Sequence, residues 1–220
     1  MIRPLIFIVI FIFHSICFSY SQLSSRIFKS DDKTNTLIFT GEADHNQVTA
    51  GVSDNTYWFT TKKQYSVSLY LDEENIKTIK ELIKKGDFET VIKDFKIHQD
   101  ISFNKSPKAI VLKFSNEKEA IDIRKDFVEN FIDDAINTDN PDIKLFLNYI
   151  THVRDTYHDG DEIIIFFADR TKIYINVCGK EMNAIQSDAL SRALLRMWIG
   201  EDKLSGMKTG LLSEIENINI

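Results

Sequence analysis

The stretch from Tyr57 to Leu71 is the longest β-like segment of this chain, and it constrains the fold more than any other feature. It is rich in aromatic and β-branched residues, which suit a pleated strand. Alternate positions share one face (Tyr65, Val67, Leu69 and Leu71), and the positions between them share the other (Ser66, Ser68 and Tyr70). We therefore expect a long strand whose two tyrosines, Tyr65 and Tyr70, point to opposite sides of a sheet.

Other segments show where the remaining strands and helices are expected. Further strands are predicted at 36–40, 109–114, 162–167, 172–177 and 181–185, and helices at 72–86, 115–136, 141–150, 187–200 and 205–216. The last three strands are joined by tight turns, which is typical of an antiparallel meander. Because strands and helices are segregated along the chain, the fold class is α+β with a mainly antiparallel sheet.

Length and composition limit the classes of protein. The chain has 220 residues, 43% hydrophobic and 27% charged, which indicates one globular domain. Its net charge is -6 and it has no dense Lys/Arg block, so nucleic acid is not expected as a partner. Two cysteines cannot build a disulfide framework or a multi-cysteine zinc site.

The N-terminus reads as a secretory signal peptide over residues 1–21. Arg3 precedes an apolar run, Leu5 to Phe13, of about nine residues, short of the roughly 20 that a spanning helix needs. Cleavage after Ser21 would send the protein into the secretory pathway or outside the cell. The alternative is an uncleaved N-terminal membrane anchor, the one case in which a membrane is expected as a partner. Residues 22–35 are predicted to be a flexible lead-in, and 36–216 the folded domain.

No motif of known catalytic chemistry occurs in the chain. His152 and His158 are six apart, which matches neither a helical pair nor a zinc spacing. Cys178 lies in a predicted turn with no histidine near it in sequence, so a nucleophilic role is not expected. Phosphate-binding and dinucleotide-binding glycine motifs are also missing. We expect no metal and no cofactor.

Two blocks of sequence resemble the chalcone isomerase-like family. The first is Lys63-Gln-Tyr-Ser-Val-Ser-Leu-Tyr-Leu-Asp72, similar to the family's K-x-Y-x-x-x-L-Y-L-[DE] strand. The second runs from Gly160-Asp through Cys178-Gly-Lys to Ala189-Leu-Ser-Arg-Ala-Leu-Leu-Arg-Met-Trp-Ile-Gly200. The resemblance implies an open-faced β-sandwich, a long sheet covered on one face by helices with a ligand cleft between them.

The resemblance also assigns candidate site residues. The family's enzymes carry a Thr on the long strand where this chain has Tyr65, and Tyr is what the fatty-acid-binding branch has there. The family's Arg falls at Ser53, and the Tyr, Lys and Asn of the first central helix fall at Ile123, Asp126 and Asn130. Only the Asn is kept, so the groups that would stabilise a phenolate and an enolate are missing.

The candidate ligand-binding residues are therefore Tyr65, Asn130, Ser53 and Tyr70, with no catalytic residue assigned. Both tyrosines could instead be packing residues of the sheet, and Asn130 a polar residue on a helix face.

Three functions remain open from the sequence. The favoured one is a non-catalytic protein that binds a fatty acid or similar small hydrophobic ligand, with a preference for an uncharged head group because the Arg is missing. The first alternative is an intramolecular lyase of the chalcone-flavanone isomerase type with an altered active site. The second is a structural or partner-binding module. An enzyme is the less favoured outcome.

Overall fold

The computed structural model describes residues 25–31, 33–53, 56–93, 95–133, 136–200 and 205–220. The predicted signal peptide, and the membrane anchor that is its alternative, lie outside the described residues. No helix in these ranges combines the length and the apolar character needed to cross a bilayer.

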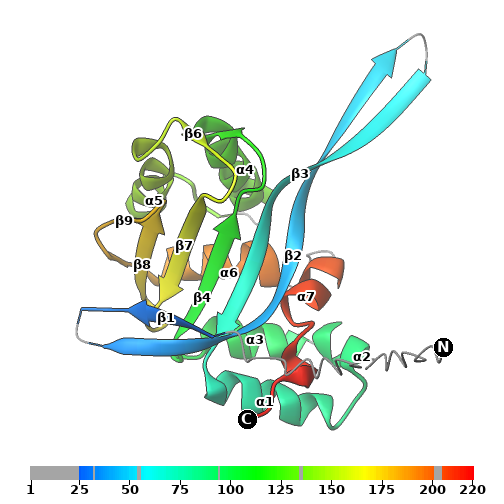
Figure 1. Cartoon of the computed structure of the whole chain (residues 1–220), viewed down its shortest axis with the longest axis vertical. Coiled ribbons are helices and arrows are strands. Elements are labelled where there is room, and N and C mark those ends of the chain that lie inside the picture. The colour runs from blue at the N-terminus through cyan, green and yellow to red at the C-terminus, as the bar shows by residue number, and fades with distance from the viewer. Residues whose placement is uncertain (1–24, 32, 54–55, 94, 134–135, 201–204) are drawn as a thin grey trace, which may run out of the picture.

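A large antiparallel sheet forms the frame of the domain (Figure 1). Within the described residues its strand order is β1-β2-β3-β4-β7-β8-β10, with β9 also paired to β8. The bounds are β1 Ser25–Lys29, β2 Thr34–Ser53, β3 Thr56–Leu71, β4 Lys108–Lys113, β7 Glu162–Phe167, β8 Lys172–Val177, β9 Lys180–Glu181 and β10 Ile185–Gln186. Two short strands, β5 Lys118–Glu119 and β6 Thr156–Tyr157, pair separately. The α+β class with a mainly antiparallel sheet is confirmed.

Polar side chains cap the N-terminal ends of some of the helices. Their bounds are α1 Glu73–Ile83, α2 Phe88–Lys93, α3 Phe95–Phe103, α4 Ala120–Asp133, α5 Pro141–His152, α6 Asp188–Ile199 and α7 Ser205–Leu211, followed by a short 3-10 turn, Ile215–Asn217. The Asp72 side chain accepts a hydrogen bond from the Asn75 backbone N–H, and Ser187 does the same for Leu190. These contacts confirm the predicted starts of α1 and α6. Helices α2 and α3 were not predicted.

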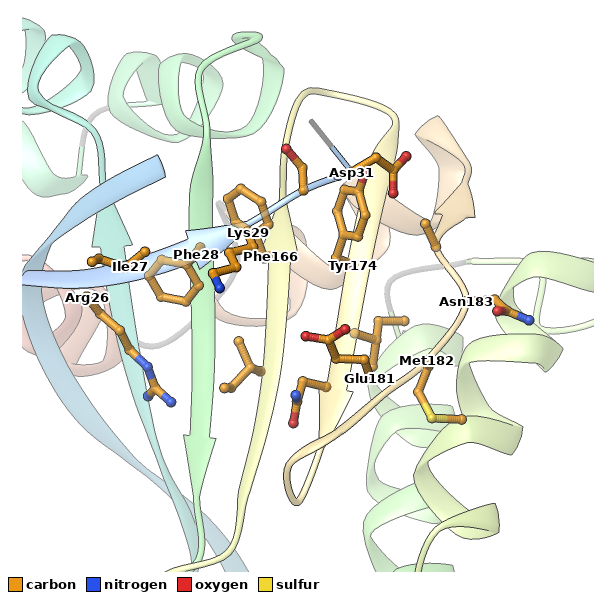
Figure 2. Close-up of a pocket in the computed structure, with 15 residues that line it drawn as sticks. Arg26, Ile27, Phe28, Lys29, Asp31, Phe166, Tyr174, Glu181, Met182 and Asn183 are labelled. Carbon is orange, nitrogen blue, oxygen red and sulfur yellow. Dashed lines mark hydrogen bonds between the residues drawn. The ribbon is translucent and has the colours of Figure 1, made fainter. Parts of the chain in front are cut away.

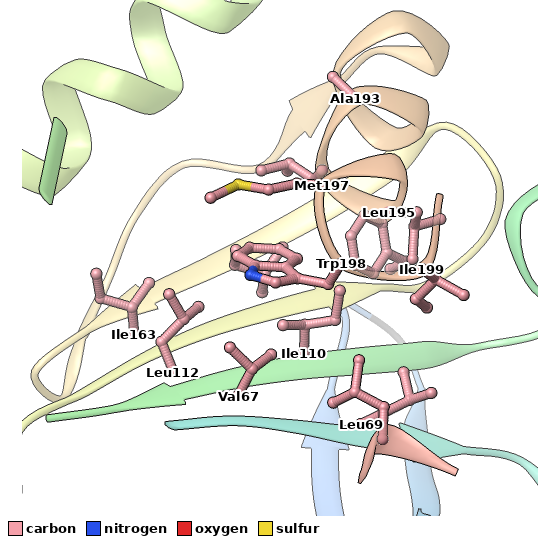
Figure 3. Close-up of a cluster of buried hydrophobic side chains, with 14 of the residues drawn as sticks. Val67, Leu69, Ile110, Leu112, Ile163, Ala193, Leu195, Met197, Trp198 and Ile199 are labelled. Carbon is pink, nitrogen blue, oxygen red and sulfur yellow. The ribbon is translucent and has the colours of Figure 1, made fainter. Parts of the chain in front are cut away.

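Strand alternation divides the sheet into two faces. The covered face packs against the helices, and Figure 3 shows Trp198 of α6 lying above side chains of the central strands. This face includes Val67, Leu69, Ile110, Leu112, Ile163 and Ile165. The opposite side, which we call the open face, carries a much smaller apolar cluster built from Phe28, Leu37, Ala109, Val111 and Phe166, with Tyr70, Ile164, Ala168 and Tyr174 at its margin. Helices on one face only are what the open-faced sandwich predicts.

The predicted flexible lead-in is wrong for residues 25–29, because they form β1. This strand pairs with the start of β2 and crosses the open face (Figure 1). Phe28 anchors it by stacking on Phe166, with ring centroids 5.5 Å apart, and by meeting Tyr70 edge-on at 5.6 Å. The contact partners lie on β7 and β3, far away in sequence, so local pattern could not show that this polar stretch would be ordered.

Strand β2 is longer than the predicted segment 36–40, with 20 residues. Beyond the end of β4, it continues with β3 as a two-stranded ribbon that projects from the body (Figure 1). A register shift between Phe39 and Gly41 bends β2 where α7 packs on it. Gly41 has φ +150°, and a Cβ there would lie 2.1 Å from the Gly210 carbonyl oxygen. Only glycine fits this approach between strand and helix.

Candidate functional site

Tyr65 lies within β3, directly before the residues of this strand that pair with β4, and it contacts α4. Its hydroxyl donates a hydrogen bond of 2.8 Å to Oδ2 of Asp126. Its ring meets Phe114 edge-on, with centroids 5.8 Å apart. The Tyr65 side chain is fully buried on the covered face, whereas Asp126 is half-buried, so this polar contact lies at the edge of the core.

Asn130 joins the same cluster from one turn further along α4. Its amide nitrogen lies 2.9 Å from the backbone oxygen of Asp126 and 3.5 Å from the carboxylate Oδ1. Asp126 therefore sits between Tyr65 and Asn130. Two of the four predicted site residues are brought together, and the residue that joins them is the one that stands where the family's Lys was expected.

The environment keeps the Tyr65 hydroxyl protonated. Burial, followed by the negative charge of Asp126, raises the pKa of Tyr65 well above its ordinary value. The Trp198 indole N–H acts on the hydroxyl in the opposite direction, although it makes no hydrogen bond of normal geometry with any described residue. The phenol is therefore a hydrogen-bond donor to Asp126 and not a proton acceptor.

Aromatic rings fill the space beside this cluster. Phe114 stacks on Tyr157 at 4.5 Å, and Phe127 meets Trp198 edge-on at 5.7 Å. All four side chains, like Tyr65, have 0% of their surface exposed, so no solvent reaches them. The expected open cleft with Tyr65 at its polar end is not present around these residues.

Tyr70 does not belong to this cluster. It lies on the open face, where it contacts Phe28, and its pKa is raised mainly by burial, with the nearby Arg26 acting against the rise. The side chain of Tyr70 points to the open face, as the strand alternation predicts. The sheet therefore lies between Tyr70 and Tyr65.

Ser53 also lies apart from Tyr65. It pairs with Thr56 near the tip of the β2–β3 ribbon, whereas Tyr65 pairs with His45 at the base. The eight residue-to-residue steps from His45 to Ser53 correspond to roughly 26 Å of extended strand. The backbone thus places Ser53 too far away to share a small ligand's head group with Tyr65.

The open face holds a pocket of about 660 Å³ that the sequence did not suggest (Figure 2). One wall is β1 and the turn after it, the floor is β7 and β8, and the other wall is the segment 181–184. Four separate stretches of chain build it, so no local motif marks it. The sequence feature that could have indicated this pocket is the apolar second face of β7 and β8, formed by Ile164, Phe166 and Tyr174.

The remaining chemical groups offer little. Burial and the charge of Asp161 raise the pKa of the Cys178 thiol to about 11, so it stays protonated at neutral pH. Among the described residues, no three His, Cys, Asp or Glu side chains are arranged to hold a metal ion.

Comparison with known proteins gives a consistent family and fold. Residues 50–213 match the family model described as chalcone isomerase-like. The structure is similar to the crystal structure of a fatty-acid binding protein from Arabidopsis thaliana, with a TM-score of 0.61 and 13% identity over 88% of this chain and 97% of that chain. No curated protein matches the sequence.

Proposed function

Since the chain belongs to the chalcone isomerase-like family, we propose that it is a non-catalytic member that binds a small hydrophobic molecule between the sheet and the helices. The observation that carries the proposal is the Tyr65–Asp126 hydrogen bond of 2.8 Å at the position of the family's site. The similarity to a fatty-acid binding protein supports the same class of ligand.

The absence of catalysis rests on the residues at the site. Ring closure of a chalcone needs a cation beside the phenolate, and the corresponding positions carry Ser53 and Asp126. A carboxylate at 2.8 Å from the tyrosine hydroxyl opposes a developing negative charge. An intramolecular lyase of altered design therefore has no support from the geometry.

Asp126 also determines which polar head group a ligand can carry. A fatty acid's carboxylate placed beside Tyr65 would meet a second, half-buried carboxylate, and the repulsion between the two negative charges is unfavourable. An uncharged hydroxyl could donate to Asp126 instead. The ligand class that fits best is thus a small hydrophobic alcohol, and binding requires the rings of Phe114, Phe127 and Trp198 to move apart.

Native mass spectrometry of the protein purified from its own host tests the proposal. We expect a retained neutral lipid, and in titrations dodecanol should bind more tightly than dodecanoic acid. Replacing Asp126 by Asn should reduce this preference, whereas the isosteric change Asp122→Asn, at an exposed position of α4, should not. Protein that carries no lipid and takes up neither probe would contradict the proposal.

The filled interior favours a second candidate, a partner-binding module. Fully buried rings in the place of a cleft are what a structural role predicts. Failure to bind either probe, combined with co-purification of one defined protein at a constant ratio, would support this role over ligand binding.

We also propose entry into the secretory pathway, on the basis of the N-terminal sequence. N-terminal sequencing of protein from its host should begin near Gln22. Recovery of residues 1–21 in a membrane fraction would instead identify an anchor.

A further inference from the structure

The open-face pocket has the size and shape of a binding site. Its volume of about 660 Å³ lies within the range of small-molecule sites, roughly 300 to 1,000 Å³. It is bounded by β1 on one side and by residues 181–184 on the other, over a floor of Ile164, Phe166 and Tyr174 (Figure 2). This place is separate from the Tyr65 cluster, because the sheet lies between them.

Aromatic rings give the floor a preference for flat apolar groups and for cations. Phe28, Phe166 and Tyr174 form a continuous row, with centroid distances of 5.5 and 5.9 Å. Cations of the protein already lie over both ends of the row: the Arg26 guanidinium is 5.9 Å from the Phe28 ring centre, and the Lys172 ammonium is 5.4 Å from that of Tyr174.

Most charges around the pocket are neutralised inside the protein. Arg26 pairs with Glu162 at 2.8 Å, and Lys172 pairs with Asp31 at 2.6 Å. Glu181 forms no ion pair with any other described residue, and Figure 2 shows its carboxylate over the floor. Lys29, on the opposite wall, is likewise without an ion pair among these residues, and both it and Glu181 are exposed.

We propose that this pocket is a second binding site, for a small amphipathic amine whose flat apolar body lies on Phe166 and Tyr174 and whose ammonium group pairs with Glu181. The carboxylate and the aromatic floor both attract a cation. Lys29 repels an amine that enters in the reverse orientation, so it favours the one with the ammonium group at the 181–184 wall.

Titration of the full chain with 2-naphthylmethylamine tests the site, with 2-naphthylacetate as the probe of opposite charge. Methyl-labelled isoleucines report the face. Ile164 lines the pocket, whereas its neighbours Ile163 and Ile165 are buried on the covered face. We expect the amine to shift the Ile164 methyl signal while leaving those of Ile163 and Ile165 almost unchanged.

Two variants should act in opposite directions. Glu181→Gln should weaken amine binding about three- to fivefold, the upper end of what one exposed ion pair contributes. Lys29→Met should strengthen it about twofold at low salt, and both effects should shrink as salt is added. Glu129→Gln, the same change on the exposed surface of α4, is the matched control and should have no effect.

The proposal is overturned if the acid binds as well as the amine, if Glu181→Gln changes nothing, or if the covered-face isoleucines respond instead of Ile164. It is also overturned if sedimentation shows a dimer that Glu181→Gln dissociates and the amine does not reach Ile164, because a second copy of the chain would then fill the pocket.

Discussion

The two faces of the sheet are packed differently. On the covered face, Phe114, which follows β4, packs with aromatic rings of α4 and α6, and no solvent reaches Tyr65. On the open face, a small apolar cluster and two ion pairs hold β1 across the strands and leave a pocket. In this chain the place where the family resemblance predicts a cleft is packed core, and a measurable pocket lies on the other side.

The largest expected difference between the faces is in the stability that is lost when a buried aromatic ring is removed. Phe127 on the covered face contacts Phe146 and Trp198 at 5.2 and 5.7 Å and is fully buried. Phe127→Ala should cost about 4 kcal/mol of unfolding free energy. Phe166→Ala on the open face should cost about 2 kcal/mol, because the adjoining pocket lets the neighbours and water adjust. Urea unfolding of both variants measures this, and equal losses would mean that the faces are packed alike.

The next effect concerns how the C-terminal helix is held on the covered side. Gly41→Ala places a methyl group against the Gly210 carbonyl and also strains a residue at φ +150°. We expect a loss of about 3 kcal/mol or more. Gly160→Ala is the matched control, since Gly160 has φ +85° but no atom within 4 Å of the methyl group that the change adds, and it should cost about 1 kcal/mol. If both changes cost the same, backbone strain and not helix contact explains the loss at Gly41.

The sequence predicted those parts of both faces that depend on local pattern. Alternation in β3 placed Tyr65 and Tyr70 on opposite sides, and the Asp72 and Ser187 caps marked the starts of α1 and α6. It did not predict β1, because that strand is stabilised by Phe28 contacts with β3 and β7. The length of β2 was missed because polar residues follow the irregularity at Gly41.

The candidate site was predictable only in part. Family positions pointed to Tyr65 and Asn130, and both lie in one cluster. The hydrogen bond that joins them through Asp126 depends on how α4 packs on the sheet, which spacing along the chain does not specify. The same is true of the open-face pocket, whose walls come from residues 26–31 and 181–184.

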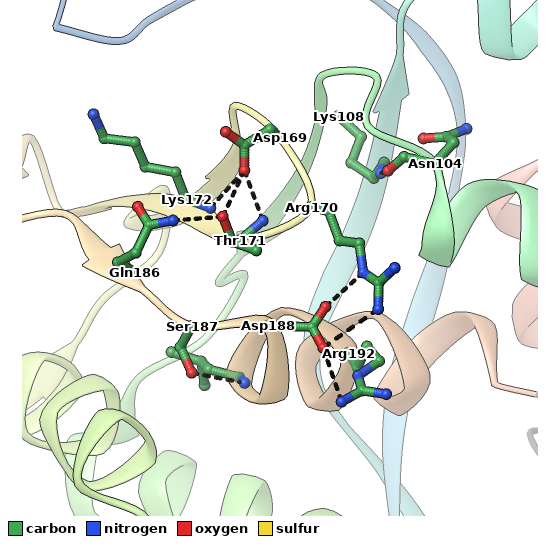
Figure 4. A network of polar contacts seen from close by, with 11 residues as sticks. Asn104, Lys108, Asp169, Arg170, Thr171, Lys172, Gln186, Ser187, Asp188 and Arg192 are labelled. Carbon is green, nitrogen blue, oxygen red and sulfur yellow. Dashed lines mark hydrogen bonds and ion pairs between the residues drawn. The ribbon is translucent and has the colours of Figure 1, made fainter.

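Lys108 offers a test of how the covered face treats a charge. It is the first residue of β4 and is almost fully buried. Its ammonium donates to the Asn104 backbone oxygen at 3.2 Å (Figure 4). Burial lowers the pKa of Lys108 from 10.5 to about 8, although Asp72 and Asp169 favour the charged form. Below pH 8 the buried Lys108 is protonated and charged, which costs the folded protein about 3 kcal/mol relative to the unfolded chain.

Lys108→Met should therefore stabilise the protein at pH 7 by about 2 to 3 kcal/mol. Because the unfolded chain keeps this proton up to pH 10.5 and the folded one loses it near 8, the stability of the unchanged protein should rise between pH 8 and 10. This rise should disappear in the variant. Denaturation at pH 7, 8, 9 and 10 measures it, with exposed Lys105→Met as control. A variant that keeps the rise would show that Lys108 is better solvated than its burial implies.

The smallest effect compares the two tyrosines. Tyr65→Phe leaves the Asp126 carboxylate without its 2.8 Å partner inside the covered face, and should cost about 1 to 2 kcal/mol. Tyr70→Phe, on the half-buried margin of the open face, should stay within about 0.5 kcal/mol. Since the cost comes from the lost Tyr65–Asp126 hydrogen bond, it should nearly vanish when Tyr65→Phe is made in an Asp126→Leu background. A cost that persists there would assign the effect to ring packing and not to the hydrogen bond with Asp126.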